Sequence, residues 1–132
     1  MTTGRRWREP LLLLAVGVGG AAGTLVRHAL LSNVASATEF PWAVLLSNVV
    51  GSFILGVAAA LHVTGRLRSR ATRAAVATGF CGGLTTFSTW MVDIVRLLRD
   101  SELLTAGAYL LATLVAGVAA LYLGVAVVRA RS

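Results

Sequence analysis

The chain has 132 residues, of which 57% are hydrophobic and 13% are charged, and its formal net charge is +7. Its apolar fraction exceeds the roughly 45–50% of a soluble domain, and its mean hydropathy is +0.81. These values exclude an ordinary soluble domain and indicate an integral membrane protein. We also expect no nucleic-acid partner, because the arginines lie between apolar runs and form no basic face interleaved with aromatic residues.

Four segments are long and apolar enough for membrane-crossing helices, which need about 20 residues to span about 30 Å of hydrocarbon. They cover residues 11–31, 41–63, 71–98 and 103–128. We therefore predict an all-α integral membrane fold with four transmembrane helices, a single membrane domain over residues 1–132, in the cell membrane. The basic start of the chain also resembles a signal peptide, but the apolar run continues to Leu31, which favours a retained helix.

The basic residues are all arginines, and they divide unequally between the two sides of this four-helix topology. Nine lie at the amino end, in the second connection and in the tail, whereas Arg27, Arg96 and Arg99 lie on the other side. The positive-inside rule therefore predicts that both termini face the cytoplasm.

Glycines recur at the spacing that lets helices pack closely in lipid, Gly19 with Gly23 and Gly79 with Gly83. Four short helices nevertheless enclose little volume. A route across the membrane would therefore need a second subunit.

The stretch GFCGGLTTFSTW, from Gly79 to Trp90, places two adjacent glycines and five hydroxyl or thiol side chains inside the third apolar segment. Glycine lowers helix propensity by about 1 kcal/mol relative to alanine, and Thr and Ser hydroxyls can satisfy backbone groups freed by a break. A break at membrane depth has to be buried in protein or face a water-filled cavity, where its carbonyls can hold a cation. The alternative is an unbroken helix that packs tightly against its neighbours.

Three further polar residues lie in or beside the apolar segments. Asn48, in the second segment, is either a functional residue or a hydrogen-bonding link between helices. Arg27 either extends to the interface or forms a positive vestibule that attracts anions. Asp93, which follows Trp90 by one turn, pairs with an arginine or supports a packing contact.

Thr105, Tyr109 and Thr113 form a polar stripe along the fourth segment, because they follow one another at four-residue spacing. Their hydroxyls can donate to a dehydrated anion or bond to a neighbouring helix. Phe87 and Trp90 are three residues apart, and aromatic ring edges can also face an anion, although such residues more often belong to a core or an interfacial belt.

These segments resemble the Fluc (CrcB) family of fluoride channels. GGAAGTLVRHAL resembles the glycine-rich first helix followed by arginine, and PWAVLLSNVVGSFILG resembles the asparagine-containing second helix. GFCGGLTTFSTW is similar to the third-helix box, the most specific of the three motifs, and the spacing of Tyr109 and Thr113 also fits. The resemblance covers essentially the whole chain.

The resemblance implies an antiparallel dual-topology dimer of two four-helix subunits, each with a break in the third helix. A structural sodium ion, which is not transported, would lie on the two-fold axis of the dimer. Its ligands would be the backbone carbonyls of Gly82 and Thr85 from each subunit, and four such oxygens suit a hard cation.

The resemblance also implies two pathways for passive export of cytoplasmic fluoride, which reduces fluoride toxicity. Fluoride is small and strongly hydrated, so close donors and positive ring edges have to replace its water, and so narrow a pore excludes chloride. Arg27 and Asp93 would have vestibule or structural roles. The residues expected along each pathway are Asn48, Phe87, Ser88, Trp90, Tyr109 and Thr113.

Three positions depart from the family pattern. Trp90 stands where phenylalanine is usual and brings an N–H donor, Ser47 replaces an apolar residue, and Asp93 replaces glutamate. The unequal arginine distribution is a further departure, because a subunit that inserts in both orientations should have a weak charge bias. The partner is therefore either a second copy of this chain or an oppositely oriented paralogue.

Two other functions are compatible with a small membrane protein. A dimeric proton-coupled transporter usually needs an acidic residue deep in a helix, and none of the five acidic residues lies centrally in a segment. A structural or assembly subunit would leave liposomes impermeable to fluoride. An enzyme is not expected, because the sequence contains no nucleophile–base pair or metal-ligand cluster.

Overall fold

The computed structural model describes residues 8–34 and 39–131, and within these ranges it contains helices and no strand. Three helices are long: α2 (Arg8–Asn33), α3 (Trp42–Val63) and α7 (Leu103–Arg129). Each is long and apolar enough to cross a membrane. They occupy the first, second and fourth predicted segments, and the fold is that of a helical integral membrane protein.

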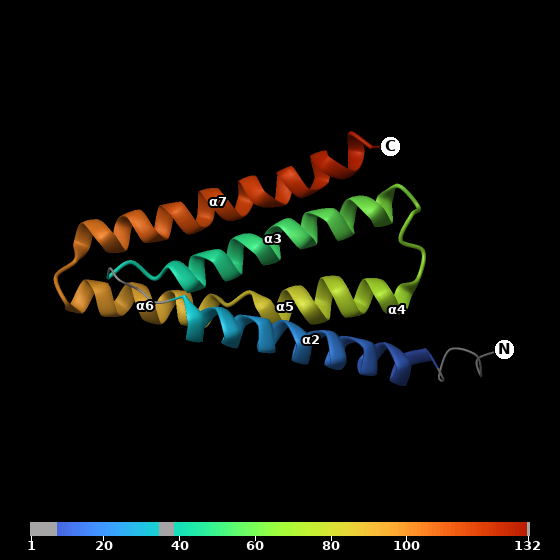
Figure 1. The fold of residues 1–132 in the computed structure, drawn as a ribbon, viewed down its shortest axis with the longest axis horizontal. Helices are drawn as coiled ribbons and strands as arrows, with labels where there is room; N and C mark the ends of the chain where they lie inside the picture. The colour runs from blue at the N-terminus through green and yellow to red at the C-terminus, as the bar shows by residue number, and fades with distance from the viewer. Residues whose placement is uncertain (1–7, 35–38, 132) are drawn as a thin grey trace.

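The third predicted segment consists of shorter helical pieces. α4 (Arg70–Arg73) continues into the π-helical η1 (Ala74–Phe80) and then into α5 (Cys81–Leu84). α6 (Phe87–Arg99) follows after a two-residue interruption. Figure 1 shows that α2 and this segment run away from the end that carries both termini, whereas α3 and α7 run back toward it.

Local signals determine how α3 ends and how α4 begins. The amide of Gly65 donates to the carbonyl of His62 at 3.1 Å, and Gly65 itself has a φ of +72°, which glycine adopts at little cost. The Ser69 hydroxyl then accepts from the amide of Thr72 at 3.2 Å and caps α4. These contacts define the short connection between the two helices.

α2 packs against η1 and α5 through glycines instead of large side chains. A Cβ atom on Gly19 or Gly23 would meet backbone atoms of η1 and α5, and one on Gly79 or Gly83 would meet the backbone of α2. The two glycine pairs singled out in the sequence therefore face each other. Their contact brings the first helix against the segment that contains the break.

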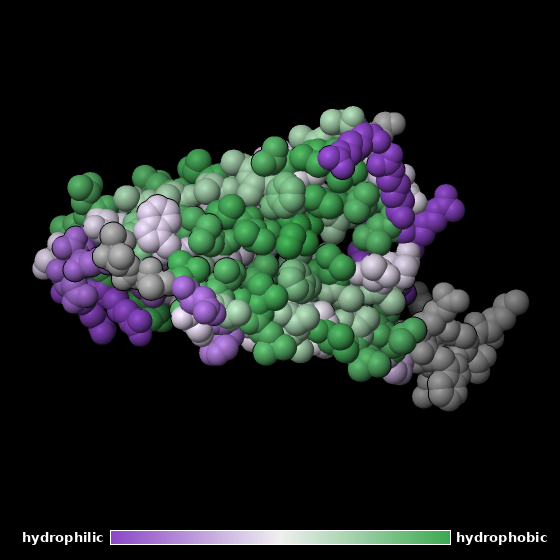
Figure 2. Space-filling view, viewed as in Figure 1, coloured by the Kyte–Doolittle hydropathy of each residue, from purple (hydrophilic) through white to green (hydrophobic). Residues whose placement is uncertain are grey.

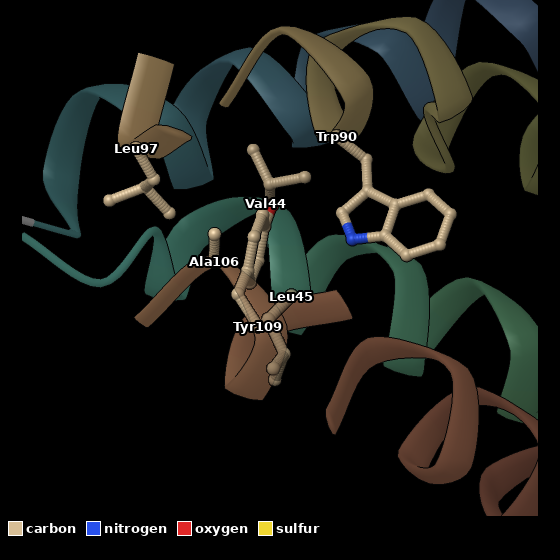
Figure 3. Packing of buried hydrophobic residues seen from close by; sticks show 6 residues of the cluster. All are labelled: Val44, Leu45, Trp90, Leu97, Ala106 and Tyr109. Carbon is tan, nitrogen blue, oxygen red and sulfur yellow. The ribbon is translucent and has the colours of Figure 1, made fainter. Parts of the chain in front are cut away.

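A hydrophobic core lies between α3, α6 and α7 (Figure 3). Its buried side chains are Val44, Leu45, Trp90, Leu97, Ala106 and Tyr109. The ring of Phe40 packs edge-on against that of Tyr109, with the ring centroids 5.3 Å apart. This core fixes the positions of Trp90 and Tyr109, two of the predicted pathway residues.

The outer surface is apolar around the middle of the molecule. Figure 2 shows hydrophobic side chains covering this region and hydrophilic ones gathered toward the two ends of the long axis. Leu13, Leu25 and Leu104 are among the large apolar residues that point outward. Such an exterior suits a protein surrounded by lipid.

The glycine contact of α2 predicts a stability difference between two alanine variants of the same helix. Gly23→Ala is expected to lower the free energy of unfolding by about 1–3 kcal/mol, because its methyl group has to displace the facing backbone. Gly17→Ala is the matched control, since its Cβ would meet nothing within 4 Å. Thermal unfolding in detergent micelles measures the difference, and equal stabilities would contradict this packing.

Candidate functional site

The helix break lies at Thr85 and Thr86. Their backbone is extended, with φ −78° and ψ 154° at Thr85 and φ −147° and ψ 122° at Thr86. The Thr85 hydroxyl donates to the carbonyl of Cys81, the first residue of α5, at 2.8 Å. The Thr86 hydroxyl accepts from the amide of Thr89 at 3.2 Å and so caps α6. Two adjacent threonines therefore end one helix and begin the next.

The adjacent glycines before the break remain helical. Gly82 and Gly83 both belong to α5, and Gly83 lies against the backbone of Gly20 on α2. The sequence predicts a break within the stretch of glycines and threonines, and the extended residues are the threonines. The reason is that threonine hydroxyls compete with the helix for backbone hydrogen bonds, whereas Gly83 allows close packing of a helix.

Asn48, on α3, replaces hydrogen bonds that the helix loses at the break. Its Oδ1 accepts from the amide of Thr86 at 2.8 Å, and its Nδ2 donates to the carbonyl of Thr86 at 3.2 Å. In an unbroken α-helix this amide would donate to the carbonyl of Gly82, so that carbonyl loses its usual partner. The Nδ2 group carries two hydrogens, and the second can serve another acceptor.

Two further side chains donate to carbonyls at the end of α5. The buried Ser47 hydroxyl donates to the carbonyl of Leu84, and Arg27 Nη1 donates to the carbonyl of Thr85 at 3.3 Å. Arg27 thus places a positive charge beside the break. In the sequence, Ser47 is only a weak predictor of a contact between helices, because a serine hydroxyl can bond within its own helix. The signal in the sequence that points to it is its place beside Asn48.

A groove of about 490 Å³ opens beside the break. Its walls come from α3, η1, α5, α6 and α7, and α2 contributes none of its lining residues. Phe87 is 70% exposed there, and its ring packs edge-on against that of Trp90, with the centroids 5.7 Å apart. The structure thus brings six of the predicted site residues to one groove: Asn48, Gly82, Thr85, Phe87, Trp90 and Thr113.

The indole nitrogen of Trp90 is buried without a hydrogen-bond partner in the part of the chain that the structure describes. The residue as a whole is only 6% exposed. Figure 3 shows its ring reaching from α6 toward α3, with the nitrogen edge on the side of Val44 and Tyr109. Because an unpaired buried N–H costs about 1–3 kcal/mol, this nitrogen is an unsatisfied donor inside the subunit.

Asp93 and Tyr109 lie outside the lining of this groove and contact each other. The Tyr109 hydroxyl donates to Asp93 Oδ2 at 3.3 Å, which links α7 to α6, and Arg96 Nη1 lies 4.0 Å from Asp93 Oδ1. Both sequence-based alternatives for Asp93, an arginine pair and a packing contact, are therefore met. Thr113 instead donates to the carbonyl of Tyr109 at 2.8 Å, within its own helix.

Ser88, the remaining predicted pathway residue, is exposed near the start of α6. Its hydroxyl lies 3.4 Å from the hydroxyl of Thr86, but Ser88 does not belong to the groove lining. Thr105 donates to the carboxylate of Glu102, which precedes α7, at 3.1 Å. Of the three hydroxyls in the polar stripe, that of Tyr109 alone bonds to a neighbouring helix in the described ranges.

Comparison with known proteins identifies the family. Residues 14–125 match the family described as CrcB-like protein, Camphor Resistance (CrcB). The fluoride-specific ion channel FluC of Prosthecochloris aestuarii is 46% identical over 118 residues, which cover 89% of this chain and 92% of the relative. FluC of Chlorobium chlorochromatii is 45% identical over 114 residues, covering 86% and 88% of the two chains.

A relative from a different genus gives the same result. The fluoride-specific ion channel FluC of Francisella tularensis subsp. mediasiatica is 40% identical over 119 residues, which cover 86% of this chain and 92% of the relative. The family resemblance predicted from the sequence motifs is confirmed, and the chain belongs to the CrcB (FluC) family.

Proposed function

We propose that this chain is a subunit of a fluoride-selective channel of the cell membrane, through which cytoplasmic fluoride leaves passively, so that fluoride toxicity is reduced. Membership of a channel family, with relatives named as fluoride-specific ion channels, supports a channel and not an enzyme. The proton-coupled transporter is not favoured, because no relative reported above bears such a name and Asp93 is already hydrogen-bonded to Tyr109.

The observation that carries this proposal is the pairing of Asn48 with Thr86 at the wall of the groove. Fluoride loses strongly bound water only where donors and positive ring edges replace it. The second Nδ2 hydrogen of Asn48 and the exposed ring of Phe87 belong to this lining, whereas the Thr113 hydroxyl there already donates to the Tyr109 carbonyl. Asn48 and Phe87 together offer the donor and the ring edge that a small, dehydrated anion requires.

The proposed channel has four crossings in each subunit. α3 ends at the end that carries the termini, and α7 begins at the opposite end (Figure 1). The segment from α4 to α6 therefore has to return the chain across the same thickness as the three long helices. Its interruption accounts for the absence of a fourth uninterrupted apolar helix among the described residues.

A second subunit is proposed to close the groove. Asn48 and Thr86 line a groove that no described element of the chain covers, and polar backbone and amide groups are not stable against lipid. An antiparallel partner would complete the lining and form two pathways, each from both subunits. This arrangement is the dual-topology dimer that the family resemblance implies.

The identity of this partner has two possibilities, a second copy of the chain or an oppositely oriented paralogue. Nine arginines mark one side of the topology and three the other, which favours one fixed orientation. Fluoride efflux from liposomes containing the chain alone would identify a homodimer. Efflux that requires a co-purified paralogue would identify a heterodimer.

A structural sodium ion, not itself transported, is proposed at the break, held by the carbonyls of Gly82 and Thr85 and their counterparts in the partner. The residues fit such an ion, because the Gly82 carbonyl loses its helical partner and both residues line the open groove. Backbone oxygens are ligands that hard cations prefer. Arg27 already donates to the Thr85 carbonyl, but a carbonyl has two lone pairs and can accept a second contact.

Trp90 is proposed to donate its indole N–H to the passing anion after its ring turns toward the groove, because the nitrogen is buried inside the subunit as the structure places it. Its unpaired, buried nitrogen supports this role, because a phenylalanine at the same place would leave no polar group to satisfy. The partner subunit is the competing acceptor for this N–H, since Trp90 also lines the groove.

Asn48→Asp is expected to lower fluoride efflux by about tenfold or more, because it removes the Nδ2 donor and adds a negative charge at the groove wall. A fluoride electrode measures efflux from liposomes containing the purified protein. Asn33→Asp is the matched control, since Asn33 is exposed near the end of α2 and should tolerate the same change. Undiminished efflux in Asn48→Asp would remove Asn48 from the pathway.

Trp90→Phe is expected to lower fluoride efflux by about tenfold at low fluoride concentration, because it deletes one hydrogen bond to a charged species and keeps an aromatic ring. Trp42→Phe serves as control, because Trp42 is exposed at the start of α3. If Trp90→Phe weakens the dimer and leaves the flux of the remaining dimer unchanged, the N–H donates to the partner instead.

Sodium is expected to raise the unfolding temperature of the dimer relative to N-methylglucamine at equal ionic strength, because an ion that binds the folded state alone stabilises it by mass action. Potassium, which is larger, should stabilise less. The measurement is a thermal melt in detergent across sodium concentrations. The same melting temperature in all three salts would argue against a sodium site formed by Gly82 and Thr85.

A further inference from the structure

The arginines at the end that carries the termini have no carboxylate partner among the described residues. The ion pair that the structure contains in those ranges, Arg96 with Asp93, lies in α6 toward the opposite end. Glu9 is the one acidic residue described near the terminal end, whereas the other four acidic residues lie toward the far end. Among the side chains that the structure describes, the exposed arginines of the terminal end are Arg66, Arg68, Arg70, Arg129 and Arg131.

Backbone contacts hold the side chains of two of these arginines in place. Arg66 Nη2 donates to the carbonyl of Arg131 at 2.9 Å, which ties the connection after α3 to the end of α7. Arg68 Nε donates to the carbonyl of Gly65 at 3.1 Å. The side chains of Arg129 and Arg131 donate to no residue in the described part of the chain. We call Arg66, Arg68, Arg129 and Arg131 the basic end.

Apolar side chains adjoin the basic end along the same two helices. Val63, the last residue of α3, is 79% exposed. On α7, Tyr122 is exposed and precedes Arg129 by seven residues, which places both on one face of the helix. Figure 2 shows the hydrophilic band near the carboxyl terminus directly beside hydrophobic surface. Guanidinium groups therefore stand at the edge of an apolar surface that faces lipid.

We propose that the basic end binds the phosphate group of an anionic phospholipid, whose acyl chains lie against α3 and α7. Guanidinium groups bind phosphate oxygens through paired N–H donors, and clusters of arginine beside a membrane helix attract anionic lipids. The adjoining apolar surface favours a lipid over a free phosphate ion, because the acyl chains of a lipid can contact Val63 and Tyr122 and a phosphate ion cannot. This site requires the chain to lie in a membrane and does not depend on which ion it conducts.

The test measures the unfolding temperature of the purified protein in detergent during titration with phosphatidylglycerol, phosphatidylcholine or inorganic phosphate. Phosphatidylglycerol is expected to raise the unfolding temperature more than either other additive. In Arg129→Gln with Arg131→Gln, the apparent affinity for phosphatidylglycerol should fall by about tenfold. Neither side chain supports the fold through a described contact, and the Arg131 carbonyl that accepts from Arg66 is retained.

Arg96→Gln with Arg99→Gln is the matched control, because it removes the same charge from the last turns of α6 at the opposite end. This control should keep the affinity for phosphatidylglycerol within about twofold of the unmodified chain. An equal loss of affinity in both double variants would mean that net charge alone causes the effect, which would contradict a lipid site at the basic end. Equal stabilisation by phosphatidylcholine or by inorganic phosphate would also overturn it. Native mass spectrometry of the unmodified chain gives an independent check, since selective retention of phosphatidylglycerol is expected and its absence contradicts the proposal.

Discussion

No backbone polar group can remain unpaired at membrane depth without a penalty of several kcal/mol. The interruption after α5 frees such groups, and side chains of α2 and α3 supply partners for several of them. The side-chain amide of Asn48 hydrogen-bonds to both the amide and the carbonyl of Thr86. The Ser47 hydroxyl donates to the carbonyl of Leu84, and Arg27 donates to the next carbonyl, that of Thr85. The break is therefore a bonded structure with defined partners, and the arrangement of α2 and α3 follows from the need to supply them.

The glycines of α2 serve this requirement as well as packing. Gly19, Gly23 and Arg27 follow one another at four-residue spacing and lie on one face of the helix. The two glycines allow that face to reach the backbone of η1 and α5, and Arg27 then meets the carbonyl of Thr85. On α3, Gly51 likewise leaves room for the side chain of Thr85, since a Cβ there would meet its methyl group. Close backbone approach is thus the condition that lets the polar side chains reach the break.

The positions of the long apolar helices and the hydrogen bonding of Asn48 to another segment could be predicted from the sequence, because hydropathy and an intramembrane amide are strong local signals. The location of the break could not be predicted to the residue. Glycine weakens a helix on any propensity scale, yet Gly83 stays helical because its contact with α2 needs a residue without a side chain. Whether Ser47 bonds within its helix or across to Leu84 depends on tertiary approach, which no single-segment pattern contains.

The location of Arg27 also affects the arginine bias that sets the orientation of the chain in the membrane. The sequence places nine arginines on the side of the termini and three on the other side. Arg27, one of these three, lies against the break and not in a connection. Arg96 and Arg99 then remain as the arginines of the far end, and the bias toward one orientation is stronger than the sequence count suggests.

In an antiparallel pair of identical chains, the basic end of one subunit would stand beside the more acidic far end of the other, and their attraction would favour a homodimer. That attraction acts only after insertion and is screened beyond about 8 Å at physiological ionic strength. Orientation is set earlier, by arginine and lysine near the helix ends, and acidic residues contribute little to it. For the proposed dimer, the charge distribution therefore favours a fixed orientation and a paralogous partner, whereas a homodimer would require part of the chains to insert against their own charge bias.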